Sequence, residues 1–147
     1  MKKACSAILS LVLVLCIGMV GGIAASATNT DAREADSPPS RLSYISMTVT
    51  NIGISGGQAS CTGSIDGYKG TTTKVVITLY LERKLASSST WTTYASSSPQ
   101  TFNSYTGTYT MSKTVVKGYQ YRVRAEYVAY AGSASEKLTG YSSVVAY

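Results

Sequence analysis

The segment GYQYRVRAEYVAY at residues 118–130 constrains the fold more than any other part of the chain. Its odd positions hold small, β-branched or aromatic residues, and its even positions hold most of the charge: Tyr119, Tyr121, Val123, Ala125, Tyr127 and Ala129 against Gln120, Arg122, Arg124, Glu126, Val128 and Tyr130. A repeat of two residues puts the two sets on opposite faces of an extended strand. We therefore expect one face to lie in a core. The question is whether the other face has a function or is only exposed to solvent.

The same two-residue period continues through the rest of the chain from Arg41, in residue types that favour strands. SYISMTVTNI at 43–52 predicts a first strand with Ile45, Met47 and Val49 inward. KVVITLYLERK at 74–84 predicts a strand that buries its odd residues and exposes Thr78, Tyr80 and Glu82.

Turn signals separate these runs at regular intervals. SGG at 55–57, DGYKG at 66–70 and AGSASEK at 131–137 are read as turns, LASSST at 85–90 as a loop, and Pro99 as a break between strands. Asp66 and Glu136 then belong to turns or loops, where they are expected to be local hydrogen-bonding or solvated groups. About seven strands with turns every 8 to 12 residues predict an all-β, antiparallel β-sandwich.

The N-terminus has the layout of a secretory signal peptide. Lys2 and Lys3 precede an apolar run, and an A-x-A site follows at Ala25 to Ala27. The run is shorter than a membrane span needs, so we expect cleavage near Ala27, secretion, and no transmembrane anchor in the mature chain. The predicted organisation is a signal peptide at 1–27, a flexible leader at 28–40 and one β-sandwich domain at 41–147.

Charge and cysteine content narrow the partners and the chemistry. Of the three cysteines, only Cys61 follows the cleavage site, so no internal disulfide can form, and Cys61 is expected inside as a small buried side chain. From Arg41 onward ten basic residues face four acidic ones, which favours anionic surfaces such as cell-wall polymers, acidic glycans or lipid headgroups. The basic residues are scattered, which disfavours nucleic acid. The absence of histidine disfavours a zinc site, and no cofactor is expected.

A family resemblance follows from KGYQYRVRAEY. This segment resembles the sixth strand of fibronectin type III and related immunoglobulin-like domains, where a turn glycine precedes a tyrosine followed by alternating small residues: here Gly118, Tyr121, Val123 and Ala125. The resemblance implies that the Tyr121 ring lies in the core and its hydroxyl bonds backbone. The whole layout is also similar to small exported proteins of Gram-positive bacteria that carry domains of unknown function.

The sequence contains few residues that could catalyse a reaction. Without histidine, a serine or cysteine nucleophile lacks its usual base. Glu82 and Glu126 are the only carboxylate pair worth testing for glycoside hydrolysis, because neighbouring strands could place both on one outer face. We expect no enzyme, and hydrolysis is the weakest hypothesis.

The candidate binding residues lie on that outer face and beside it. Tyrosine rings stack on sugars, and arginines bind carboxylates or phosphates through two nitrogens; the candidates are Tyr80, Arg122, Arg124, Val128, Tyr130 and Trp91. For Trp91 a cap on the core is favoured over a stacking role. The alternative for the arginines is plain charge pairing on a wet surface.

The sequence therefore predicts a secreted, non-catalytic binding or structural protein that acts at or outside the cell envelope. A cell-wall or host glycan, or a protein, is the expected partner. A bacteriocin-like or membrane-active protein is the alternative.

Overall fold

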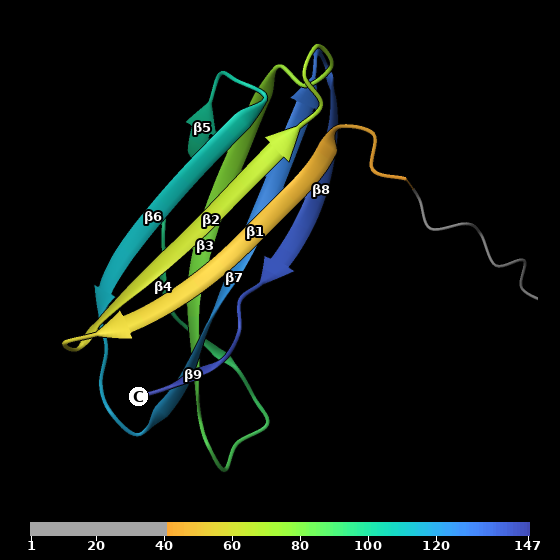
Figure 1. The fold of residues 1–147 in the computed structure, drawn as a ribbon. Helices are drawn as coiled ribbons and strands as arrows, with labels where there is room; N and C mark the ends of the chain where they lie inside the picture. The colour runs from red at the N-terminus through yellow and green to blue at the C-terminus, as the bar shows by residue number, and fades with distance from the viewer. Residues whose placement is uncertain (1–40) are drawn as a thin grey trace, which may run out of the picture. The chain divides into compact units, whose positions relative to one another are not determined.

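The computed structural model describes residues 41–147, which form two antiparallel β-sheets packed face to face (Figure 1). The predicted signal peptide and leader, residues 1–27 and 28–40, lie outside the described residues. The strands are β1 (Ile45–Ser55), β2 (Gln58–Gly67), β3 (Lys74–Leu85), β4 (Thr92–Ser96), β5 (Gln100–Phe102), β6 (Thr106–Thr114), β7 (Tyr119–Ala131), β8 (Ala134–Tyr141) and β9 (Val145–Ala146). The prediction of an all-β sandwich is confirmed. No helix capable of crossing a membrane occurs within 41–147.

The two sheets have the orders β1-β2-β6 and β4-β3-β7-β8, with β5 paired to β3 and β9 to β7. The structure has nine strands within 41–147, whereas about seven were expected. The difference arises because β3 pairs with two separate pieces, β4 and β5, and β7 pairs with two others, β8 and β9. Pro99 separates β4 from β5, since proline cannot donate to a strand ladder. Between β8 and β9 the Ser142 hydroxyl accepts a bond from the Val123 amide at 2.8 Å, while the Ser142 amide donates to the Val123 carbonyl at 2.9 Å.

The core lies between the sheets and is built mainly from the odd residues of β3 and β7. Val75, Ile77, Leu79 and Leu81 have no exposed surface, as predicted, and neither do the odd residues of β7 from Tyr121 to Ala129. These strands pair along their whole length at the centre of the larger sheet. Their alternation follows directly from burial of one face against β1, β2 and β6.

The first strand differs from its prediction. Only Ile45 is buried as expected, while Met47 and Val49 are 54% and 41% exposed. The pairing register shifts by one residue between Ile45 and Met47, so a β-bulge at Ser46 reverses which residues point inward. Beyond the bulge Ile52 and Ile54 pack against the core instead.

The segment AGSASEK is also different from its prediction, because only Gly132 and Ser133 form the turn and β8 begins at Ala134. Glu136 is therefore a strand residue and not a solvated loop residue. Its carboxylate accepts backbone N–H bonds from Ser43 at 3.1 Å, Tyr44 at 2.9 Å and Ile45 at 3.0 Å. Burial raises the pKa of Glu136, but these three bonds outweigh it and the net pKa is lowered. Glu136 thus ties the start of β1 to the opposite sheet.

Two buried tyrosines fix the strands by their hydroxyls. Tyr121 donates to the carbonyl of Val116 at 2.9 Å and accepts from the Val116 amide at 3.1 Å, which confirms the backbone contact that the resemblance implied. The Tyr127 hydroxyl lies 2.7 Å from the Val49 carbonyl and 2.8 Å from the Thr50 hydroxyl. Both polar ends are satisfied, so each large ring can be buried without a desolvation penalty.

Cys61 is fully buried in the core as expected. Burial raises the pKa of its thiol to about 11. The thiol therefore stays protonated near neutral pH and is a poor nucleophile.

Candidate binding surface

The outward-facing residues of β3 and β7 form one continuous surface, which we call the β3–β7 face. Across the two strands Tyr80 lies opposite Arg124, and Glu82 lies opposite Arg122. The remaining members are Lys74, Val76 and Thr78 of β3, Glu126, Val128 and Tyr130 of β7, Lys137 and Tyr141 of β8, and Trp91 before β4. The prediction that Tyr80, Glu82 and the even residues of β7 share one face is confirmed.

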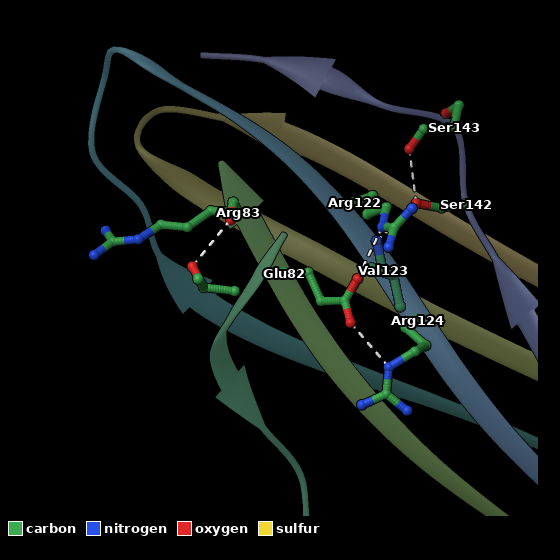
Figure 2. A network of polar contacts seen from close by, with 8 residues as sticks. Glu82, Arg83, Arg122, Val123, Arg124, Ser142 and Ser143 are labelled. Carbon is green, nitrogen blue, oxygen red and sulfur yellow. Dashed lines mark hydrogen bonds and ion pairs between the residues drawn. The ribbon is translucent and has the colours of Figure 1, made fainter. Parts of the chain in front are cut away.

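Glu82 is the centre of this surface and is only 7% exposed (Figure 2). Its two carboxylate oxygens accept separate bonds, from Arg122 Nε at 2.8 Å and from Arg124 Nε at 2.9 Å. Charge-assisted bonds of this kind are stronger than neutral ones. The two arginines therefore hold a nearly buried carboxylate, and the carboxylate in turn fixes where both guanidinium groups lie.

The network continues from Arg124 towards β8. Arg124 Nη1 donates to Glu126 at 2.7 Å, and Lys137 Nζ lies 2.9 Å from the other oxygen of Glu126. Partial burial alone would lower the pKa of Arg124, but its bonds to Glu82 and Glu126 raise it. The Lys137 bond is the main cause that lowers the pKa of Glu126, and Arg124 adds to it. Arg124 thus has two of its nitrogens engaged by carboxylates.

Both guanidinium groups lie over aromatic rings. The Tyr80 ring centroid lies 3.8 Å from Arg124 Cζ. Arg122 Cζ lies 4.3 Å from the Trp91 ring and 4.6 Å from the Tyr141 ring, which approach from opposite sides in the sheet. Such cation–π contacts are worth about 0.5–1 kcal/mol when exposed and more when desolvated.

The position of Trp91 corrects its favoured interpretation as a cap on the core. It packs on Arg122, on the outer side of the sheet, and it is half-buried there. The loop at 86–91 brings it across the end of β3 to reach β7. Sequence alone could not place it, because nothing local to Trp91 shows which side of the sheet the loop crosses.

Val128 and Tyr130 lie at the other end of the same face and do not join this cluster. Val128 pairs with Val76 on one side and Lys137 on the other. The Tyr130 ring lies 4.0 Å from Lys74 Nζ. Both residues are half-buried by these cross-strand neighbours, which accounts for an apolar residue at an outward position.

Sequence reasoning missed Tyr141, Lys137 and the central place of Glu82. The terminal run GYSSVVAY had no clear register, so Tyr141 could not be assigned to a face. Ser142 is the residue that could have indicated the register. Its hydroxyl accepts the Val123 amide, so the regular pairing of β8 with β7 ends at Tyr141, which lies opposite Arg124. Charge pairing across the strands was among the sequence-based interpretations, and Glu82 does lie opposite Arg122. The prediction that Glu82 is exposed is wrong, because both arginines bind its carboxylate and leave the residue 7% exposed.

The two carboxylates considered for hydrolysis share the face as predicted, and both contact cations. Glu82 binds two arginines, while Glu126 binds Arg124 and Lys137. Among residues 41–147, no group of three or more potential metal-ligating side chains occurs. What the surface offers chemically is an ordered array of charges and rings.

Comparison of the chain with family models, curated proteins and solved structures found no match. The function must therefore be inferred from the residues of this chain and their geometry.

Proposed function

We propose that this protein is a secreted, non-catalytic binding protein that acts at or outside the envelope of a Gram-positive bacterium. Its ligand would be an envelope or host polysaccharide, bound on the β3–β7 face. The observation that carries the proposal is the ordered stack of Trp91, Arg122 and Tyr141 beside the Glu82 ion pairs. The N-terminal layout of basic residues, apolar run and A-x-A site supports secretion.

The contacts within the stack favour binding because they order its side chains before a ligand arrives. Free arginine and aromatic side chains lose roughly 0.5–1.5 kcal/mol each when a partner immobilises them. Here the side chains of Arg122, Trp91 and Tyr141 already restrain one another. Tyrosine and tryptophan also supply large, rigid contact areas that suit sugar rings and protein side chains.

We also propose that the sandwich is of the fibronectin type III or immunoglobulin-like kind. Two observations support it: the sheet orders β1-β2-β6 and β4-β3-β7-β8, and the bonds from the Tyr121 hydroxyl to Val116. Such scaffolds are known for hosting many unrelated binding sites, so the fold by itself supports no particular ligand.

The test is retention of the purified protein on isolated cell walls, compared with two variants. Trp91→Ala with Tyr141→Ala removes the rings on Arg122 and should weaken retention several-fold, since aromatic contacts of this kind carry much of the energy of binding surfaces. The matched control is Thr62→Ala with Thr110→Ala. The hydroxyl oxygens of these two residues lie 2.9 Å apart on the outer face of the other sheet, and the control removes both. Equal retention of the wild type and the Trp91/Tyr141 variant would reject the β3–β7 face as the binding site.

The alternative of a membrane-active protein predicts a different result. Dye should then leak from lipid vesicles on addition of the protein, and retention on lipid-free cell walls should be absent. Leakage without wall retention would replace the proposed function by this alternative.

A further inference from the structure

Several basic residues lie at one end of the sandwich, where β3 and β6 finish and β2 and β7 begin. Strand pairing places this end: the last residues of β3 face the first of β7, and the last of β6 face the first of β2. We call it the β6–β7 end; in Figure 1 it is the end nearest the C-terminus. It carries half of the ten basic residues of 41–147: Arg83, Lys84, Lys113, Lys117 and Arg122.

Acidic side chains are nearly absent from the same end. Of the four in the described part of the chain, only Glu82 lies there, and both its oxygens are occupied by Arg122 and Arg124. Asp66 and Glu136 lie at the opposite end of the strands. Five positive side chains against one paired carboxylate make a locally positive surface that attracts anions over about a Debye length, roughly 10 Å at 0.1 M salt.

Two arginines at this end share one arrangement. Arg83 on β3 lies between Tyr94 of β4 and Tyr119 of β7, with its Cζ at 4.3 Å and 4.5 Å from the ring centroids. Arg122 on β7 lies between Trp91 and Tyr141 at similar distances. Each guanidinium thus lies over two aromatic rings, which come from segments on either side of its own strand.

The nitrogens of these two arginines are largely unused. Among residues 41–147, Arg122 engages only its Nε, with Glu82, and the Arg83 side chain makes no hydrogen bond or ion pair. The N–H groups that remain can still donate hydrogen bonds to a ligand. Those N–H groups match two oxygens of one carboxylate or phosphate. Arg124 differs, because Glu82 and Glu126 already engage it.

From this geometry we infer that the β6–β7 end is an oxyanion-binding site for an extended anionic polymer, with Arg83 and Arg122 as its two recognition residues. Arg83 and Arg122 point to opposite faces of the larger sheet, near the same end of β3. A polymer that crosses this end can place successive oxyanions on both of them, while Lys84, Lys113 and Lys117 attract it less specifically. The inference rests on the proposed binding function and names the chemical class of its ligand.

The site would recognise oxyanions whether they come as carboxylates or as phosphates. Polygalacturonate supplies carboxylates, inorganic polyphosphate supplies phosphates, and fully methyl-esterified polygalacturonate supplies the same backbone without charge. Titrating the purified protein with each polymer shows whether the site binds carboxylates, phosphates or both. We expect binding to at least one charged polymer, none to the ester, and an affinity that falls steeply with salt.

Arg83→Gln and Arg122→Gln should each weaken binding of the charged polymer about tenfold, and together by more, because each removes a charge-assisted contact. The charge-matched control is Lys69→Gln, an exposed residue at the opposite end, which should bind nearly as the wild type does. Arg83→Lys and Arg122→Lys keep the charge without the two-nitrogen geometry and should lose part of the affinity. They also keep the test decisive if a glutamine variant fails to fold.

Three results would overturn the inference: equal binding of the ester, equal weakening by Lys69→Gln, or binding to phosphatidylglycerol vesicles and to neither charged polymer. Failure here is distinguishable from failure of the proposed function. Retention on cell walls that depends on Trp91 and Tyr141, without affinity for either charged polymer, would leave the binding function standing and remove only the oxyanion site.

Discussion

Replacing Glu136 by glutamine should destabilise the sandwich because one carboxylate holds the start of β1 to β8. One oxygen accepts from the Tyr44 and Ile45 amides, and the other accepts from Ser43. Glutamine can keep its oxygen on one side only, so its NH₂ group must face a backbone donor on the other. Bonds to charged groups contribute about 1.5–3 kcal/mol each, and a partly exposed site lies at the low end of that range.

We therefore expect Glu136→Gln to cost about 2 kcal/mol, which lowers the melting temperature by about 8 °C for a domain of this size. The cost should depend on pH in a defined direction. The native pKa of Glu136 lies below its ordinary value of 4.5, so its stabilising effect is fully present above pH 4.5 and is lost as pH falls through the native pKa. The difference in stability between wild type and variant should therefore be full at pH 7 and smaller at pH 3.

The assay is urea or thermal unfolding followed by circular dichroism at pH 7 and pH 3. Glu126→Gln is the matched control: its pKa is also lowered, but its partners are side chains, one of them the 59% exposed Lys137, and ion pairs of this kind contribute less than about 1 kcal/mol. A loss below about 0.5 kcal/mol for Glu136→Gln at pH 7, or a loss of equal size at both pH values, would refute the reasoning.

Three further predictions follow from the core. Tyr121→Phe removes a buried hydroxyl that bonds both backbone groups of one residue, so it should cost about 1–3 kcal/mol in urea unfolding; a variant as stable as wild type would contradict this. Cys61, with its pKa raised to about 11, should not react with a thiol reagent in the native protein at pH 8 and should react fully in urea; native labelling at the unfolded rate would show that it is accessible. Gly140→Ala places a Cβ 2.7 Å from Thr50 Oγ1 and should lower the unfolding midpoint, whereas a Cβ at Gly53 meets nothing within 4 Å, so Gly53→Ala should be near neutral; equal effects of the two changes would be inconsistent with the packing.

The sequence predicted that the outer residues of β3 and β7 share one face, but it did not predict which contacts they make there. Alternation in GYQYRVRAEYVAY placed Arg122 and Arg124 on one face, and that face is correct. The partners that give the arginines their environment come from other segments: Glu82 from β3, Trp91 from a loop and Tyr141 from β8. Which segments meet is a property of strand order and register, so the arginines looked equivalent in sequence although only Arg124 has carboxylates on two nitrogens.

What the sequence determined by itself was the strand character, the inward faces of β3 and β7, and the break at Pro99. These follow from local chemistry: a two-residue period, β-branched residues, and a proline without an N–H. Only the tertiary structure decided that Met47 points outward and that Glu136 is a strand residue bonded to β1. The physical reason is that a bulge or a register is selected by the opposing strand, whose buried side must remain apolar, and no local pattern in β1 or β8 records that neighbour.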